Sequence, residues 1–255
     1  MNEVIERISK IGIVPVLTID DANTAKAAAG SLARGGIDAA EITFRTPAAE
    51  ESIKRIASAE PDILLGAGTV TSVECVKRAC AAGAKFIVTP GYNPTVVDYC
   101  MKNKITIIPG CMDTNTLEIA MEAGIDTIKF FPAEATGGIN MLKALSGPYT
   151  TFKFIPTGGI NKDNMNKYLS FKKVIAIGGS WMANREMISR GRFDEIERLA
   201  REAVNTMLDL RVDISEVKTM AMGSELKLIT TNKERAKYHL EKFRIDANKL
   251  SLTEK

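Results

Sequence analysis

The chain has 255 residues, of which 45% are hydrophobic and 25% charged, and its formal net charge is +3. This balance is typical of a soluble globular protein, and the weak basic excess indicates neither a nucleic-acid partner nor a membrane partner. No apolar run approaches the ~18 residues of a membrane span, and the charged N-terminus is unlike a signal peptide, so we expect a cytoplasmic location.

The cysteines and the histidine limit the chemistry further. The four cysteines show no CxxC spacing, which favours reduced thiols in a cytoplasm. These residues are Cys75, Cys80, Cys100 and Cys111. Because His239 is the only histidine, a metal site built on clustered histidines is excluded, and we expect neither a metal nor another cofactor. His239 lies in a lysine- and glutamate-rich segment, where we expect a surface side chain.

Strand and helix patterns alternate along most of the chain, after a short amphipathic helix predicted over residues 1–10. Strands are predicted at 13–17, 39–45, 63–68, 86–89, 105–109, 127–131, 153–156 and 174–177. A helix follows each strand, at 20–35, 46–58, 72–82, 94–102, 114–123, 140–145, 162–169 and from 182 onward. Eight such units with short connections predict an α/β fold, a single (β/α)8 TIM barrel. An open doubly wound sheet is the alternative, although no GxGxxG motif follows the first strand.

The last part of the chain departs from this rhythm. Residues 212–224 have the composition of a loose linker, and a strand at 226–229 and a helix capped by Asn232 are predicted after it. We therefore expect two parts: a barrel with its N-terminal helix, residues 1–210, and a C-terminal strand–helix extension, residues 211–255, of unknown role.

A lysine, Lys129, lies in the apolar strand predicted at 127–131. Burying an ammonium group without a partner is costly, and the usual response is a lowered pKa. A neutral lysine amine can attack a carbonyl carbon. The alternative is an ordinary lysine that extends from a strand end into solvent. The other residues near Lys129 distinguish a nucleophilic lysine from an ordinary one.

The strand predicted at 39–45 has charged residues on one face. Its period-two alternation places Glu41, Thr43 and Arg45 together, and reactive groups of a barrel lie at the carboxyl ends of strands. A structural ion pair between Glu41 and Arg45 is one interpretation. In the functional interpretation, Arg45 binds a substrate carboxylate with its planar guanidinium group and Glu41 moves protons.

Paired glycines follow the seventh and eighth predicted strands. The two segments are Thr157-Gly158-Gly159 and Gly178-Gly179-Ser180. Unsubstituted backbone N–H groups at this end of a barrel are typical of a phosphate site. One Gly-Gly pair can simply serve a tight turn, but two at these positions favour anion binding. At the end of the third strand, Thr69 can donate a further hydrogen bond.

Two long segments, Gly36–Arg45 and Gly124–Gly137, resemble the signature segments of the 2-keto-3-deoxy-6-phosphogluconate (KDPG) / 4-hydroxy-2-oxoglutarate (KHG) aldolase family. The resemblance covers roughly residues 1–210, in order. It implies a metal-free class I, Schiff-base aldolase of the Entner-Doudoroff type, commonly a homotrimer. Such an enzyme cleaves KDPG into pyruvate and glyceraldehyde 3-phosphate, and KHG into pyruvate and glyoxylate.

The resemblance also implies a role for each candidate site residue. Lys129 forms the imine, Glu41 is the acid/base residue, and Arg45 and Thr69 bind the pyruvyl carboxylate. The distal phosphate is held by Thr157, Gly158, Gly159, Gly178, Gly179 and Ser180. Three alternatives stay open: the galactonate-type aldolase, a phosphate-binding biosynthetic barrel whose lysine is a general acid, and a non-catalytic assembly module.

Overall fold

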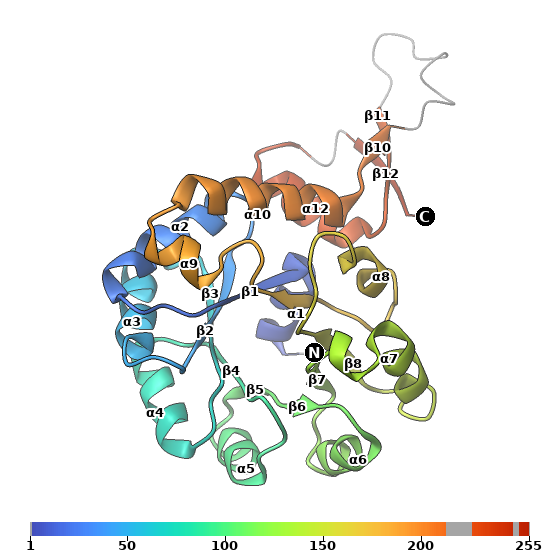
Figure 1. Cartoon of the computed structure of the whole chain (residues 1–255). Coiled ribbons are helices and arrows are strands. Elements are labelled where there is room, and N and C mark those ends of the chain that lie inside the picture. Colours follow the sequence, from blue (N-terminus) through green and yellow to red (C-terminus); the bar gives the residue numbers. More distant parts are fainter. Residues whose placement is uncertain (1, 213–225, 247–249, 255) are drawn as a thin grey trace.

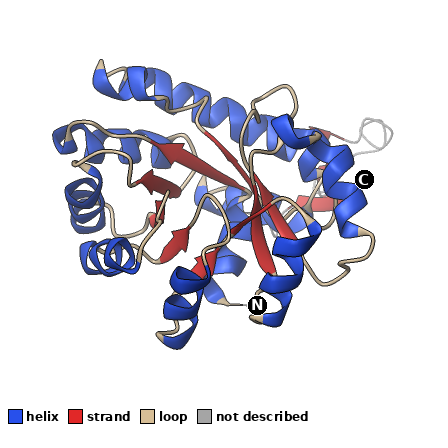
Figure 2. Cartoon of the chain, turned by 60° about the horizontal axis from the view of Figure 1, so that its bottom comes forward, coloured by secondary structure: helices blue, strands red, loops and turns tan. Residues whose placement is uncertain are grey.

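The computed structural model describes residues 2–212, 226–246 and 250–254. Its centre is a curled, parallel β-sheet, and helices surround the sheet on its outside (Figure 1). A second view shows the strands in the interior and the helices as an outer layer (Figure 2). Within these residues, no helix is long and apolar enough to cross a membrane.

The strands and helices of this α/β unit alternate as predicted, except that two short strands, at 106–108 and 110–111, stand in place of the fifth predicted strand. The strands are β1 Ile13–Leu17, β2 Ala39–Thr43, β3 Leu64–Gly68, β4 Phe86–Val88, β5 Thr106–Ile108, β6 Gly110–Cys111, β7 Thr127–Phe130, β8 Lys153–Pro156 and β9 Ile177–Gly179. The helices are α1 Glu3–Ile11, α2 Ala25–Arg34, α3 Ala49–Ala59, α4 Val73–Ala82, α5 Pro94–Lys102, α6 Thr114–Glu122, α7 Gly138–Ser146, α8 Met165–Leu169, α9 Arg185–Ser189 and α10 Phe193–Leu208. Short 3-10 turns, η1 Ala22–Thr24 and η2 Glu134–Thr136, precede α2 and α7.

The strands pair in two runs. One sheet has the order β5-β4-β3-β2-β1-β9 and the other has the order β6-β7-β8, with all pairs parallel. Only Pro109 separates β5 from β6, and proline has no N–H to donate to a ladder. Two isolated bridges connect the β8 side to the β9 side. Phe154 pairs with Val174, which lies just before β9, and Thr157 pairs with Gly178, which lies within β9. The sheet therefore curls so that β8 lies beside β9.

Local sequence signals explain these elements. Ser72, Asn93 and Asp113 each accept a backbone N–H three residues further on, and so cap α4, α5 and α6. All residues of β2 and β3 are buried, as expected for parallel strands covered by helices. The hydrophobic core is continuous between the strands and the inner faces of the helices.

Two strand predictions missed an end by two residues or more. β2 stops at Thr43, because its partner β3 stops at Gly68 and Thr69 turns away with a positive φ of 55°. Arg45 therefore lies in a turn and not in the strand. The eighth strand is β9, and it begins at Ile177, three residues later than predicted, because its register on β1 pairs Ile13 with Ile177.

The C-terminal extension forms a small sheet and one helix. Its strands are β10 Arg211–Val212, β11 Leu226–Thr230 and β12 Leu250–Glu254, and its helix is α12 Lys233–Lys242. β10 is antiparallel to β11, whereas β11 and β12 are parallel. The predicted strand and the Asn232 cap are confirmed, whereas β12 was not predicted. Beyond Val212, the predicted linker lies outside the described residues.

The prediction that His239 is a surface residue was wrong. His239 is fully buried, and its Nε2 lies 3.0 Å from the carbonyl oxygen of Ile11. Burial lowers the pKa of the imidazole from its usual 6.5. The lysines and glutamates of α12 hid the fact that His239 lies on the face that packs against α1. On the same face, Arg235 is 4% exposed and donates to the carbonyl oxygens of Ser9 and Ile175.

Candidate active site

Lys129 and Glu41 meet inside the curled sheet. Lys129 is the third residue of β7 and Glu41 the third of β2, and their side chains are 8% and 4% exposed. The Lys129 Nζ lies 3.0 Å from Oε1 and 3.3 Å from Oε2 of Glu41. The predicted interior positions of both residues are thus confirmed. A carboxylate faces the lysine, so its amine is not buried without a partner.

The carboxylate of Glu41 lies in space that a glycine leaves free. A Cβ atom at Gly68 of β3 would overlap the Glu41 carboxylate, so only glycine fits beside it. Glu41 occupies the space that a side chain at this end of the third strand would take. Gly68 therefore allows the carboxylate to reach across to Lys129.

A small cavity of about 10 Å³ adjoins the pair, close to the room that one water needs. Its lining consists of Val14, Glu41, Phe86, Val88, Ile108, Lys129, Ile155, Thr157 and Gly178. The Nζ of Lys129 also lies 5.3 Å from the ring centroid of Phe131. In this apolar surrounding, Glu41 is within reach to take a proton from the lysine and leave a nucleophilic amine.

Arg45 and Thr69 lie together near the exposed rim of the sheet. The Arg45 Nε donates to Thr69 Oγ1 over 3.1 Å, and Arg45 is exposed. Thr69 holds a left-handed backbone conformation, which costs energy for a β-branched residue. The Glu41–Arg45 ion pair does not occur in the described part of the chain, where Glu41 pairs with Lys129. The structure thus brings together the two residues predicted to bind a carboxylate.

The two paired-glycine segments lie side by side. Thr157 bridges Gly178, whose Cβ would overlap the Thr157 hydroxyl. A Cβ on Gly179 would overlap the ring of Trp181. Gly178 and Gly179 belong to β9 itself, not to a turn after it, so close packing explains these glycines. Ser180 follows them and is exposed.

The Gly158-Gly159 turn has the stronger features of an anion site. Both residues have positive φ angles, 99° and 78°, that side chains rarely adopt. The Gly158 carbonyl accepts the N–H of Glu134 over 3.0 Å, and the Gly159 carbonyl accepts the side-chain amide of Asn164 over 3.0 Å. Among the hydrogen bonds of the described residues, none uses the N–H of Gly159. The carbonyls are engaged and an N–H remains available to a ligand.

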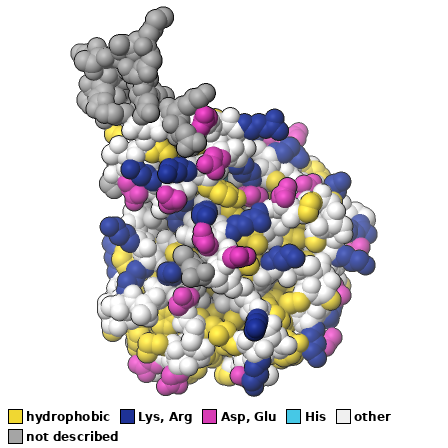
Figure 3. All heavy atoms as spheres, turned by 180° about the vertical axis from the view of Figure 1, so that it is seen from behind, with side chains coloured by type: hydrophobic (Ala, Val, Ile, Leu, Met, Phe, Trp, Pro, Cys, Tyr) yellow, Lys and Arg dark blue, Asp and Glu magenta, His cyan; other side chains and the backbone are white. Residues whose placement is uncertain are grey.

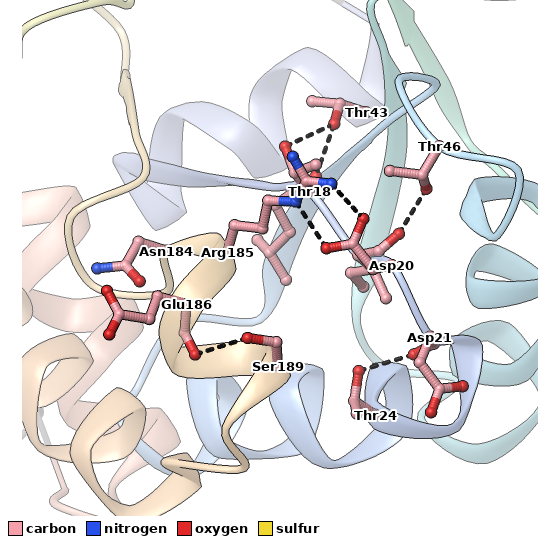
Figure 4. A network of polar contacts seen from close by, with 12 residues as sticks. Thr18, Asp20, Asp21, Thr24, Thr43, Thr46, Asn184, Arg185, Glu186 and Ser189 are labelled. Atoms are coloured by element: carbon pink, nitrogen blue, oxygen red, sulfur yellow. Dashed lines mark hydrogen bonds and ion pairs between the residues drawn. The ribbon is translucent and has the colours of Figure 1, made fainter.

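A polar network that was not predicted ties the loops after β1 and β9 (Figure 4). Arg185 makes a two-pronged ion pair with Asp20, with both N–O distances 2.6 Å. Near this ion pair, the hydroxyls of Thr18 and Thr43 lie 3.0 Å apart. The signal in the sequence was weak, because Asp20 and Arg185 are 165 residues apart in the chain and no local pattern pairs them. The network holds the loop that follows Ser180.

No group of three or more histidine, cysteine, aspartate or glutamate residues within the described ranges could hold a metal ion.

Comparisons with known proteins agree with this geometry. A family model described as KDPG and KHG aldolase matches residues 4–199. The 2-dehydro-3-deoxy-phosphogluconate aldolase of Haemophilus influenzae is 43% identical over 204 residues, which are 80% of this chain and 96% of that protein. The KHG/KDPG aldolase of Escherichia coli is 38% identical over 192 residues, 75% of this chain and 90% of that protein.

A solved structure is also similar. The KDPG aldolase of Legionella pneumophila, crystallised with pyruvate captured at low pH as a covalent carbinolamine, superposes with a TM-score of 0.76 at 36% identity. The match covers 79% of this chain and 98% of that one.

Proposed function

Because the chain belongs to the KDPG and KHG aldolase family, we propose that it is a class I aldolase that cleaves KDPG into pyruvate and glyceraldehyde 3-phosphate. KHG, cleaved into pyruvate and glyoxylate, is the second proposed substrate. The observation that carries the proposal is the buried contact of 3.0 Å between Lys129 and Glu41. An amine beside a carboxylate, in an apolar cavity, is the minimum that imine chemistry requires.

Lys129 supplies the nucleophile. Glu41 takes a proton from Nζ, and the neutral amine attacks C2 of the keto acid to give a carbinolamine. Loss of water, with a proton returned by Glu41, gives an iminium ion. The iminium accepts the electron pair of the breaking C3–C4 bond, and this produces the enamine of pyruvate. Protonation at C3 and hydrolysis then release pyruvate and restore the amine.

Glu41 is proposed as the proton carrier of every step. The cavity beside it has room for about one water, which can carry a proton between the carboxylate and the C4 hydroxyl. That hydroxyl must lose its proton as the aldehyde forms. One group therefore serves as both base and acid, because each proton that it takes is returned later in the cycle.

Arg45 and Thr69 are proposed to bind the carboxylate of the pyruvyl part. Their mutual hydrogen bond uses the Nε of Arg45, and the two terminal nitrogens of the guanidinium remain to bind a carboxylate through both of its oxygens. This contact fixes C2 over the amine, and KDPG and KHG share it, since both are 2-keto acids.

The distal phosphate of KDPG is proposed to bind at the paired glycines. The available N–H of Gly159 and the exposed hydroxyl of Ser180 support this assignment. Gly158, Gly178 and Gly179 are proposed to face the phosphate with their backbones, although close packing alone explains why Gly178 and Gly179 lack side chains. Thr157 lies between this site and Lys129, with its side chain in the wall of the cavity.

We further propose that the curled sheet closes into a (β/α)8 barrel. The bridges from Phe154 and Thr157 to the β9 side support closure at one seam, and the single residue Pro109 between β5 and β6 supports it at the other. Residues 1–210 would form this catalytic barrel. Residues 211–255 would form an extension that braces its amino-terminal end through Arg235 and His239.

A homotrimer and a cytoplasmic location complete the proposal. Exposed large hydrophobic residues on and around α5 and α6 support an interface between copies. They are Met101, Met112, Ile119 and Met121, each exposed by 43% to 49%. Hydrophobic side chains also gather in the lower half of the face seen in Figure 3. The mass in solution tests the trimer, and the four free cysteines support a reducing compartment.

Steady-state assays test the proposed activity. The purified protein should release pyruvate from KDPG, and Lys129→Met should abolish that release. The galactonate-type epimer, tested in parallel, decides the preferred configuration at C4. If neither epimer nor KHG yields pyruvate, the aldolase assignment is wrong.

A further inference from the structure

Glu134 joins the segment after β7 to the paired-glycine turn after β8. Its backbone N–H donates to the carbonyl of Gly158 over 3.0 Å, and the preceding N–H, of Ala133, donates to the carbonyl of Thr157 over 2.8 Å. Lys129 lies in β7, just before this segment. The peptide planes of the turn are therefore held by the strand that carries the lysine.

The side chain of Glu134 points to the helix layer, where it meets Tyr168. The Tyr168 hydroxyl donates to Glu134 Oε1. Tyr168 belongs to α8 and is 1% exposed, and burial followed by the bond to Glu134 raises the pKa of its hydroxyl well above 10. The hydroxyl therefore keeps its proton, and a buried hydroxyl requires an acceptor. Glu134 supplies it.

Two glycines fit closely around this hydrogen bond. A Cβ on Gly159 would lie 2.7 Å from the Cβ of Glu134. A Cβ on Gly138 would lie 3.1 Å from Glu134 Oε1 and 3.2 Å from the Tyr168 hydroxyl. Glu134 therefore fills the space that a side chain at position 159 would need. The position of the Glu134 side chain and the position of the turn are therefore coupled.

The other side of the turn is held by Asn164. Its amide donates to the Gly159 carbonyl over 3.0 Å, and its Oδ1 accepts the N–H of Asn161 over 2.9 Å. Glu134 and Asn164 thus engage both carbonyl oxygens of the turn. An anion that approaches the turn meets an N–H group and not an unpaired carbonyl dipole.

We propose that Glu134 and Tyr168 are positioning residues for the phosphate of the substrate. Their hydrogen bond fixes the Gly158-Gly159 turn in the geometry that offers an N–H to the phosphate. It also holds the negative charge of Glu134 toward α8 and away from the dianion. This inference rests on the proposed function, in which the paired glycines bind the phosphate.

Tyr168→Phe tests the inference most cleanly, because it removes the hydroxyl and keeps the ring that fills the core. We expect kcat/KM for KDPG to fall by about tenfold, mostly through KM, while kcat/KM for the unphosphorylated KHG stays within about twofold. Glu134→Gln keeps an acceptor for Tyr168, so it should behave like the parent chain, whereas Glu134→Ala should reproduce the effect of Tyr168→Phe.

The chain offers a matched control in Tyr149, whose hydroxyl donates to Glu118 over 2.9 Å on the surface of the protein. Tyr149→Phe should leave kcat/KM unchanged for both substrates. Equal losses on KDPG and KHG in Tyr168→Phe would mean that the pair only stabilises the fold, and would overturn the inference.

A second variant separates this inference from the proposed phosphate site. Ser180→Ala should lower kcat/KM for KDPG and not for KHG if the phosphate binds where proposed. A selective Ser180→Ala with an unselective Tyr168→Phe would refute the positioning pair alone. If both are unselective while KDPG is still cleaved, the phosphate assignment is wrong and the inference is withdrawn with it.

Discussion

The contact between Lys129 and Glu41 predicts that each single replacement is more harmful to stability than the double replacement. Lys129→Met keeps the length of the side chain and removes the charge. Glu41→Gln keeps the shape, but its amide offers one acceptor where two carboxylate oxygens lie 3.0 Å and 3.3 Å from Nζ. An N–H group would then face the ammonium. Each single variant therefore leaves one buried charge without its partner.

The magnitude follows from burial. Breaking a buried ion pair by removal of one partner costs about 3–5 kcal/mol, whereas replacing both partners by neutral groups is often close to neutral. For a chain of this length, 1 kcal/mol shifts Tm by roughly 2–4 °C, so each single variant should lose about 6–20 °C. The double variant should recover at least ~2 kcal/mol relative to the sum of the two single losses.

Urea or thermal denaturation of the four proteins measures this coupling directly. The exposed pair Lys102–Asp98 on α5, with an N–O distance of 2.6 Å, is a matched control whose coupling should be below ~1 kcal/mol. Additive losses at Lys129 and Glu41 would show that the two groups do not interact as a buried ion pair. The argument from their 3.0 Å contact would then fail.

Three further predictions concern the rim of the site and the extension. Ser180→Ala should lower kcat/KM for KDPG by about fivefold to tenfold and leave KHG unchanged, as measured by pyruvate release. Arg45→Lys should instead raise KM for both substrates by about tenfold, since both present a carboxylate to the guanidinium group, and an effect on only one substrate would contradict that placement. The pKa of His239 is lowered from 6.5 by burial, so the unfolded chain binds its proton more tightly; the stability from neutral His239 is present above about pH 6.5 and declines as the pH falls toward the folded pKa. Tm should therefore fall between about pH 7.5 and pH 5.5, and His239→Gln, which keeps an N–H donor for Ile11, should lose part of that dependence.

Much of the fold could be predicted because its signals are local. The bounds of α5, Pro94–Lys102, and of β8, Lys153–Pro156, agree with the sequence prediction residue for residue. Asn93 caps the first, and Pro156 and paired glycines end the second. The end of β2 could not be predicted from its own residues, since it depends on where the partner strand turns at Thr69.

His239 shows a different limit. On its helix, α12, Arg235 and His239 share the buried side with Ala236 and Leu240, although lysines and glutamates surround them in the sequence. These two polar side chains can be buried because they lie within hydrogen-bond distance of backbone carbonyl oxygens at the end of α1 and before β9. These carbonyl groups are more than 50 residues away in the chain. Hydrogen-bond partners so far away in the chain cannot be predicted from a pattern of neighbouring residues.

The burial of Glu41 and Lys129 was predictable from the sequence, but their pairing was not. The alternation pattern placed Glu41 in the interior, and the apolar neighbours of Lys129 indicated that it is buried. Only the folded structure shows that these two residues, 88 positions apart in the chain, form a pair. Nothing local distinguishes Arg45 from Lys129 as the partner of Glu41. The hydrogen bond between Glu134 and Tyr168 was not predicted for the same reason, since it joins two segments that are 34 residues apart in the chain.

The central claim is that Lys129 forms an imine with the keto acid. Incubation with pyruvate and borohydride, followed by digestion and mass spectrometry, tests it directly, because reduction makes the adduct permanent. We predict one reduced pyruvyl group on the peptide that contains Lys129, and none in Lys129→Met. A label on another lysine, such as Lys143 or Lys153, or no label in a chain that cleaves KDPG, would contradict the account.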